Sequence, residues 1–177
     1  MIICDGDGDT YLSKDIDIDQ HRSDRNHPDI MKWCRQYTLI SKANQNGWYD
    51  RIQTDSSICM FSIRKGMRTI YDDQIGVCGL TSIDRHNRGA EFSIYITPDH
   101  QKTGYGNSAL TALIDHGFND FGLNRIWGEV FEGNPALNKF ILLGFSPYGV
   151  ARQAYFRDGQ FINATLIECL AQDWRER

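Results

Sequence analysis

The chain has 177 residues, of which 41% are hydrophobic and 24% are charged, values close to those of ordinary globular domains. This length suits one compact domain with a buried core, and the composition argues against a disordered or fibrous protein. The net charge is -4; the six aspartates and one lysine of residues 1–20 contribute -5, which leaves +1 for the other residues. The rest of the chain is nearly neutral and has no basic stripe, which argues against a nucleic-acid partner.

The five cysteines are odd in number, form no C-x-x-C pair and lie mostly within apolar runs. This usage predicts a reduced, cytoplasmic protein whose cysteines pack as small apolar side chains. The first residues lack a basic region followed by a long apolar stretch, and no 18-residue apolar window occurs. We therefore expect neither export nor membrane insertion.

An Asp-Gly-Asp-Gly-Asp run at residues 5–9 separates two short apolar segments, and Asp-Gly pairs predict a hairpin turn there. The alternative is a calcium loop. That pattern requires glycine and glutamate where this chain has Thr10 and Ile16, so we expect no metal site.

Two short helices are expected next, over about residues 28–36 and 41–52, with Ser41 able to cap the second. The first is indicated by an apolar face with helical spacing, made of Ile30, Trp33, Cys34 and Tyr37. Residues 58–64 and 75–83 are β-prone and separated by turn residues, which predicts an antiparallel pair.

The second half of the chain alternates strands and helices. Residues 91–97 form a strand that ends at Pro98, because proline cannot donate to a sheet. The patterns then predict a helix over 104–121, a strand over 125–131, a helix over 135–143, and a hairpin of 145–156 with 161–170.

The junction between the 91–97 strand and the following helix reads T-P-D-H-Q-K-T-G-Y-G-N-S over residues 97–108. Gly104 and Gly106 would let main-chain N–H groups approach a bound anion, and the helix start adds a favourable dipole. A plain tight turn is the alternative, since G-x-G is common. The stretch is neither a P-loop nor the dinucleotide motif, which would need a glycine in place of Ala109.

Residues 101–106, Q-K-T-G-Y-G, match the Q/R-x-x-G-x-G/A acetyl-CoA motif of the GNAT acetyltransferases. Matching passages follow in that superfamily's order, at 118–131, 134–136, 144–145 and 155–161. The chain resembles the superfamily over about residues 28–170, weakly before 74 and well from 90 onward. The closing hairpin is similar to the branch that acetylates ribosomal proteins, polyamines and amino sugars.

The resemblance implies one acyl-CoA N-acyltransferase domain over residues 1–177. Its fold would be α/β, with a mixed, mostly antiparallel central sheet flanked by helices. The sheet would be splayed between two parallel central strands, those at 91–97 and 125–131. Acetyl-CoA would enter this splay as the co-substrate.

By the same resemblance, the main chain of Ile94, Tyr95 and Ile96 would pair with the pantetheine arm of acetyl-CoA. Asn134 would contact that arm. The pyrophosphate would be held by the amides of Gln101, Lys102, Thr103, Gly104, Tyr105 and Gly106. Ordinary sheet or cap packing is the alternative for each of these residues.

Acetyl transfer needs a neutral amine, whereas amines resembling lysine have a pKa near ~10 in water. A group at the site must accept the proton. A carboxylate can do so directly or through water, and the candidates on strands facing the site are Glu91 and Glu129. A solvated position at the rim is the alternative for both. A strand amide near Tyr95 would hold the thioester oxygen.

The residue that protonates the departing thiolate is not evident. Many family members have a tyrosine four residues before the Gly-Phe pair, but this chain has Phe140, which carries no proton to donate. Tyr95, Tyr105, Tyr148 or water remain open for that role.

The predicted activity is acetyl transfer from acetyl-CoA to a primary amine of a small molecule or peptide. An amino sugar, a protein amino terminus and a polyamine remain open as acceptors. The acceptor would approach near residues 28–52 and 145–170, which offer Trp33, Trp48, Tyr148 and Tyr155. The alternatives are a non-catalytic acyl-CoA sensor, favoured by Phe140, and a scaffold that forms a homodimer through the final hairpin.

Overall fold

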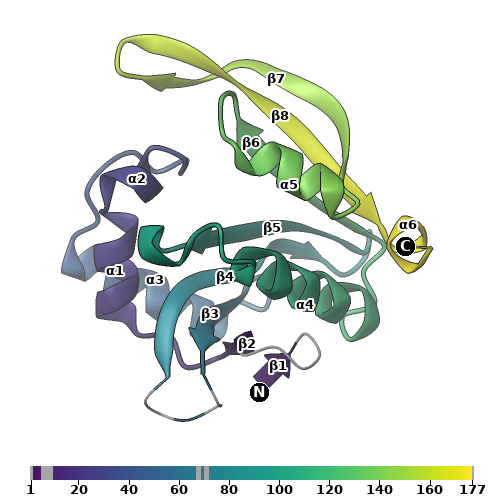
Figure 1. Cartoon of the computed structure of the whole chain (residues 1–177), viewed down its shortest axis with the longest axis horizontal. Helices are drawn as coiled ribbons and strands as arrows, with labels where there is room; N and C mark the ends of the chain where they lie inside the picture. The colour runs from purple at the N-terminus through teal and green to yellow at the C-terminus, as the bar shows by residue number, and fades with distance from the viewer. Residues whose placement is uncertain (1, 5–9, 67–68, 70–71, 177) are drawn as a thin grey trace.

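The computed structural model describes residues 2–4, 10–66, 69 and 72–176 (Figure 1). These residues build one eight-stranded sheet in the order β1-β2-β3-β4-β5-β6-β8-β7. Only β5 and β6 pair in parallel among the described strands, and the other neighbours are antiparallel. The strands are β1 (Ile2–Cys4), β2 (Thr10–Ser13), β3 (Cys59–Lys65), β4 (Asp73–Asp84), β5 (Gly89–Ile96), β6 (Arg125–Phe131), β7 (Ser146–Arg157) and β8 (Gln160–Leu170).

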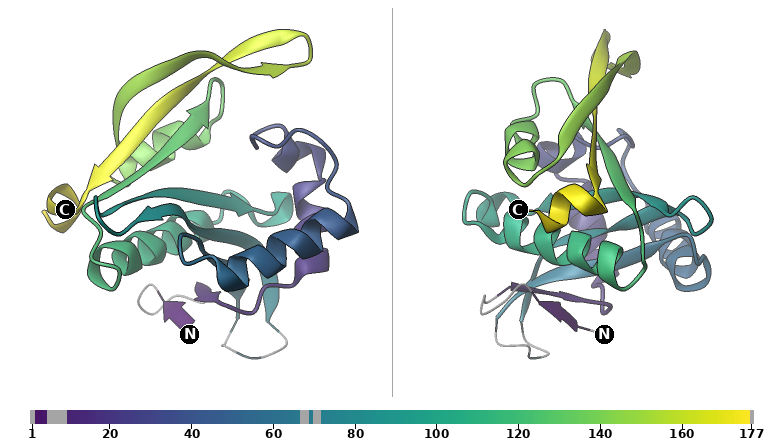
Figure 2. Two further views of the ribbon diagram at one scale, coloured as in Figure 1. Left: turned by 180° about the vertical axis from the view of Figure 1, so that it is seen from behind. Right: turned by 90° about the vertical axis from the view of Figure 1, so that its right-hand side faces the viewer.

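Helices flank both faces of this sheet (Figures 1 and 2). Successive strand residues point to opposite faces, so Phe61 packs toward α4 while Met60 packs toward Trp48 of α3. The described helices are α1 (Ile18–Arg25), α2 (Pro28–Met31), α3 (Lys42–Thr54), α4 (Tyr105–Asn119), α5 (Ala136–Leu142) and α6 (Ala171–Arg175). The mixed α/β fold expected from the sequence is confirmed.

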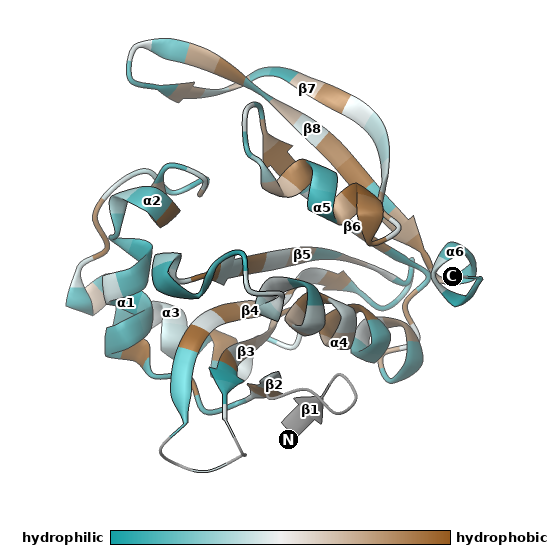
Figure 3. Ribbon diagram, in the orientation of Figure 1, coloured by the Kyte–Doolittle hydropathy of each residue, from teal (hydrophilic) through white to brown (hydrophobic). Residues whose placement is uncertain are grey.

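The main core lies between the sheet and α4. Leu110, Leu113 and Ile114 of α4 are fully buried, and burial of such a side chain contributes about 1.5–3 kcal/mol. Gly117 brings the helix close to the sheet, because a Cβ there would lie 2.7 Å from Ile126 Cδ1. Figure 3 shows the contrast with α1, which is mostly hydrophilic.

The parallel pair is short, and its divergence shapes the middle of the molecule. β5 and β6 pair only through Gly89–Arg125, Ala90–Ile126 and Glu91–Trp127. Beyond Glu91, β5 keeps only β4 as a described neighbour, and β6 keeps only β8. We call the unpaired stretch between β5 and β6 the splay, and Figure 1 shows β6 rising away from β5 there.

The early helices differ most from expectation. The helix predicted over 28–36 ends at Met31, and α1 was not anticipated at all. Of the predicted apolar face, only Ile30 is buried, since the residues after α2 are drawn into contacts with other parts of the chain. The second predicted helix is confirmed as α3, with Ser41 Oγ accepting from the amide of Asn44.

The strand pair of 58–64 and 75–83, the later strands and helices, and the closing hairpin are confirmed within a few residues. A short helix, α6, follows the hairpin and was not predicted. β1 and β2 are antiparallel, as a hairpin requires, but the predicted turn at 5–9 lies outside the described residues.

Candidate active site

The loop between β5 and α4 has the strand, turn and helix order that the sequence predicts. A single 3₁₀ turn spans Pro98–His100, and α4 begins after Gly104, which has φ +95°. Lys102 has φ +64°, also in the left-handed region. Glycine adopts that region at no steric cost, whereas other residues pay about 1–2 kcal/mol.

This loop presents main-chain donors that have no acceptor. The amides of Asn107 and Ser108 donate to the Gly104 carbonyl, and the Gln101 amide donates to Pro98. Within the described part of the chain, the amides of residues 102–106 meet no acceptor. A Cβ built on Gly104 would have no atom within 4 Å. The loop is therefore an open set of N–H groups at a helix N-terminus, which suits an anion.

The free edge of β5 lies next to this loop. Ile94, Tyr95 and Ile96 pair with Cys78, Val77 and Gly76 of β4, and no described strand lies along their other edge. An unpaired strand edge offers main-chain donors and acceptors to an extended ligand.

Asn134 lies where β6 leads into α5. Its Oδ1 accepts from the amide of Ala136 at 3.0 Å, so part of its side chain caps the start of α5. The side chain is half-buried. Its side-chain nitrogen, Nδ2, has no acceptor among the described residues, which leaves two N–H donors for another group.

The two predicted carboxylates lie together at the start of the splay. Glu91 and Glu129 are on the sheet face opposite α4 and α5, and the Arg35 guanidinium bridges them. Arg35 forms a two-pronged contact with Glu91, with Nη1 at 3.2 Å from Oε2, and its Nε lies 3.4 Å from Oε2 of Glu129. The Glu91 side chain is 10% exposed and that of Glu129 21%. Neither is a solvated rim residue.

Residues 34–37, which include Arg35, form hydrogen bonds with the tip of the β7–β8 hairpin. Arg157 donates to the carbonyls of Cys34 and Arg35, and the Tyr37 hydroxyl donates to Asp158. Figure 2 shows the α2 region and the tip of the β7–β8 hairpin on the same side of the molecule. These contacts hold residues 34–37 against the tip of the hairpin.

Tyr155 of β7 completes the carboxylate cluster, because its hydroxyl donates to Glu129. Burial and the neighbouring carboxylate raise the pKa of Tyr155, so the phenol keeps its proton at neutral pH. We use the name carboxylate cluster for Glu91, Glu129, Arg35 and Tyr155. The sequence pattern does not indicate Arg35, because this residue belongs to no motif and reaches the site only through the fold.

The Tyr95 side chain points away from the splay into a buried polar cluster with His21 and Asp24. Its hydroxyl donates to Asp24 Oδ2 at 3.1 Å and lies 2.9 Å from His21 Nδ1. Burial and the Asp24 carboxylate raise the pKa of Tyr95. Burial also lowers the pKa of His21 to about 3, with Arg25 contributing, so this imidazole is neutral.

The three tyrosines considered as proton donors therefore differ. The Tyr95 hydroxyl donates its proton in a hydrogen bond to Asp24. Tyr105 is the first residue of α4, with its ring 6.4 Å from that of His100, and Tyr148 lies 5.1 Å from the Arg125 guanidinium. Phe140 packs against Phe92 and Phe145 as an ordinary core ring.

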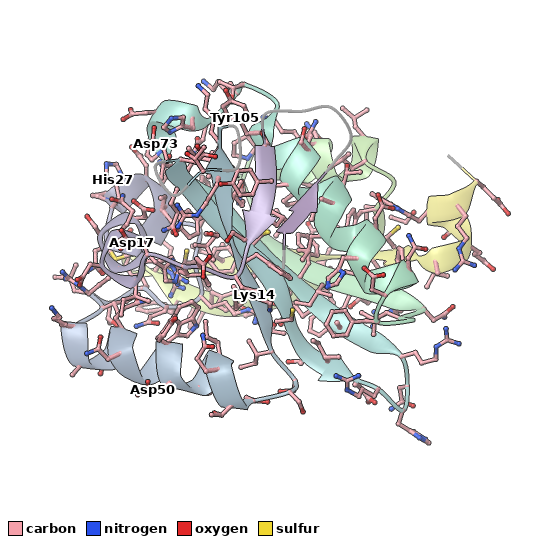
Figure 4. The ribbon with its side chains drawn as sticks, turned by 90° about the horizontal axis from the view of Figure 1, so that it is seen from below. Lys14, Asp17, His27, Asp50, Asp73 and Tyr105 are labelled. Atoms are coloured by element: carbon pink, nitrogen blue, oxygen red, sulfur yellow. The ribbon has the colours of Figure 1, made fainter. Side chains whose placement is uncertain are left out.

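An acidic pocket of about 540 Å³ lies beside the carboxyl end of β5. Asp17, Asp24, Asp73 and Asp99 line it together with His27 and His100. Figure 4 labels Asp17, His27 and Asp73 on this side of the molecule. The pocket shares no residue with the carboxylate cluster, but residues 97–100 in its lining lead directly into the loop at 101–106.

No helix among the described residues is long and apolar enough to span a membrane. Residues 12–142 match the sequence profile of the acetyltransferase (GNAT) domain family. Similar proteins include an uncharacterised N-acetyltransferase of Bacillus subtilis, 34% identical over 86 residues, which covers 48% of this chain and 49% of that protein. A spermidine N(1)-acetyltransferase of Escherichia coli is 32% identical over 101 residues, covering 56% of this chain and 54% of that protein.

Among solved structures, the fold is similar to a spermidine N-acetyltransferase from Vibrio cholerae in complex with CoA and spermine. The TM-score is 0.88 at 22% identity, and the match covers 94% of this chain and 98% of that one. The sequence matches to the first two relatives span about half of their length. The structural match covers nearly all of both chains, and it establishes the fold.

Proposed function

The chain belongs to the acetyltransferase (GNAT) domain family, and on that premise we propose that it transfers an acetyl group from acetyl-CoA to a primary amine. The observation that carries this proposal is the meeting of two features at one place. The splay opens beside β5, and the amides of residues 102–106 face no acceptor within the described chain.

The residues present fit acetyl-CoA. The amides of Lys102 to Gly106 would hold its pyrophosphate, whereas the predicted Gln101 amide already donates to the Pro98 carbonyl. The open space at the Gly104 Cβ position leaves room for that group. The free edge of Ile94–Ile96 would pair with the pantetheine arm, and the spare amide of Asn134 would donate to it. When bound, acetyl-CoA supplies an activated acetyl thioester.

We assign the base to the carboxylate cluster. Glu129 is the first candidate, because it is the more exposed of the two acids and has the longer contact with Arg35. Its carboxylate would take the proton from the ammonium, directly or through one water. Glu91, held on two atoms by Arg35, would act as the base only after that contact loosens.

The acceptor that suits this cluster best carries positive charge. Two carboxylates already hold a guanidinium between them, so the place is favourable for a cation. We propose a polyamine-like alkylamine as the acceptor, in preference to an amino sugar or a protein amino terminus. The likeness to a spermidine acetyltransferase supports this choice.

The proton for the departing thiolate would come from Tyr105, Tyr148 or water. Tyr95 is set aside because its hydroxyl proton is bound to Asp24. A main-chain amide of β5 near Tyr95 would still hold the thioester oxygen, since that role uses the backbone and not the phenol.

We also propose that residues 1–177 form a single acyl-CoA N-acyltransferase domain. The support is that one sheet runs from β1 at Ile2 to the end of β8 at Leu170 without a second sheet among the described residues.

The test is to incubate the purified protein with acetyl-CoA and to measure thiol release with three acceptor classes: spermidine, glucosamine and a short peptide with a free amino terminus. We expect thiol release with spermidine at a rate at least tenfold above the other two. Of the three acceptors, only spermidine carries positive charges besides the amine that reacts. Calorimetric titration with acetyl-CoA alone completes the design. Binding without release from any amine would favour the sensor, and no binding would favour the scaffold.

A further inference from the structure

A second cluster of reactive side chains lies away from the splay, between β3 and α4. Cys59 opens β3 and lies on the sheet face that α4 covers, where the neighbouring His116 of that helix acts on its pKa. Lys14 Nζ lies 3.0 Å from Cys59 Sγ. Asp120, at the end of α4, is bonded to His116 Nδ1. The four residues come from three separate parts of the chain.

This arrangement stabilises a thiolate. Burial by itself raises the pKa of the Cys59 thiol, but the hydrogen bonds from His116 and Lys14 outweigh it, so the pKa lies below its usual value. The pKa of His116 is raised despite burial, because Cys59 and Asp120 favour the imidazolium. A thiolate beside an ammonium and an imidazolium is a strong nucleophile.

The other described cysteines provide an internal contrast. Cys78 is fully buried on the same sheet face, and burial followed by the nearby Cys59 raises its pKa. Burial raises the pKa of Cys34 as well. Of Cys34, Cys59 and Cys78, only Cys59 has a lowered pKa, and neither the carboxylate cluster nor the loop at 101–106 uses it.

Access to Cys59 is narrow. The residue is 7% exposed, and Lys14 covers it, with Nζ also 4.2 Å from the centre of the Phe61 ring. Lys14 itself is exposed, and Figure 4 labels it in the view from below. A reagent of about the size of water reaches such a site more readily than a bulky electrophile.

We propose that Cys59 is a site of modification by hydrogen peroxide, activated by Lys14 and His116, with Asp120 orienting His116. The thiolate sulfur attacks one peroxide oxygen, forming an S–O bond as the O–O bond breaks. Sulfur loses two electrons to the peroxide, and the leaving hydroxide takes the imidazolium proton of His116 and departs as water. The product is a sulfenic acid at Cys59.

The test exposes the intact protein to sub-millimolar hydrogen peroxide and then removes the peroxide. The protein is unfolded in the presence of dimedone, so that a buried sulfenic acid is also trapped, and the label is located by peptide mass spectrometry. We expect Cys59 to be labelled about tenfold or more faster than Cys78 and Cys34 at neutral pH, following its thiolate fraction. Equal or slower labelling of Cys59 would overturn the proposal.

A variant pair tests the activation itself. Lys14→Met keeps the aliphatic stem and removes the ammonium, and Lys42→Met is the control at another exposed lysine, paired only with Asp19 at 3.9 Å. We expect Lys14→Met to slow Cys59 labelling about tenfold at neutral pH and to shift its rate profile to higher pH. Lys42→Met should change neither. A profile in Lys14→Met identical to that of the parent protein would contradict the assignment, since a packing role for Lys14 would leave the profile in place.

Discussion

The two halves of the proposed site are built in opposite ways. The loop at 101–106 is one continuous stretch whose functional groups belong to the main chain, shaped by Gly104 at its turn. The carboxylate cluster is made of side chains from β5, β6, β7 and the segment after α2. We therefore expect the loop to tolerate changes of side chain but not of backbone shape, and the carboxylate cluster to show the reverse sensitivity.

The largest effect is expected from Gly104→Val. A branched side chain would both strain the left-handed backbone and fill the space left for the pyrophosphate, so acetyl-CoA affinity should fall about 100-fold or more, about 2.7 kcal/mol. Calorimetric titration measures it.

The control is Gly159→Val in the β7–β8 turn. Gly159 has φ +80° and equally open space at its Cβ position, so it shares the backbone strain but lies outside the loop. Equal losses of affinity in both variants would mean that strain, and not the anion site, explains the result.

The carboxylate cluster should respond to changes of charge. Glu129→Gln should lower kcat about 100-fold at neutral pH, an effect that eases as pH rises and more of the amine is already neutral. Glu91→Gln should have a smaller effect if Glu129 is the base. Steady-state thiol release over a pH series distinguishes the two.

Glu168→Gln is the matched control, since Glu168 is also a sheet carboxylate paired with an arginine, with Arg125 Nε at 2.6 Å. It should leave turnover unchanged. If neither Glu129→Gln nor Glu91→Gln slows the reaction, the base lies elsewhere.

β5 contributes to both halves of the proposed site, because it carries Glu91 and leads into the loop at 101–106. The hydroxyl of its Tyr95 contacts the neutral imidazole of His21. The pKa of His21 is about 3 in the folded protein and near 6.5 when unfolded, so the unfolded chain binds the extra proton as pH falls below about 6.5. Folding stability should therefore decline with falling pH, with His21 accounting for about 2 kcal/mol of loss by about pH 5.

Urea unfolding at pH 7 and at about pH 5 measures that loss. His21→Gln keeps a donor for the Tyr95 oxygen and removes the titration, so its stability should depend less on pH. His86→Gln, in an exposed loop, should keep the dependence of the parent chain. The same slope in all three proteins would rule out His21 as its source.

The smallest effect is expected from Arg35→Ala. Without the guanidinium, a cationic acceptor no longer competes for the carboxylates, so KM for spermidine should fall about tenfold with little change in acetyl-CoA affinity. Arg152→Ala removes an exposed arginine of β7 and controls for net charge. An unchanged or higher KM in Arg35→Ala would show that Arg35 does not occupy the acceptor position.

The amino-acid pattern predicted β5, the glycine turn, α4 and β6 because the sequence signals for these elements are local. Strand alternation, Pro98 and Gly104 each act on their own neighbours. The helix expected over 28–36 failed for the converse reason. Its apolar spacing was a local signal, but Arg35 and Tyr37 gain contacts with Glu91 and Asp158, far along the chain. α1 was missed because its eight residues have no apolar face, although Asp17 caps it.

The sequence by itself determined the family, the order of the strands and helices, and the loop that offers main-chain donors to an anion. Only the tertiary structure decided that Arg35 bridges Glu91 and Glu129, that the Tyr95 hydroxyl is committed to Asp24, and that Lys14 and His116 meet at Cys59. The physical reason is distance along the chain. A backbone turn depends on a few adjacent residues, whereas a charge cluster depends on side chains that become neighbours only when the sheet and helices pack.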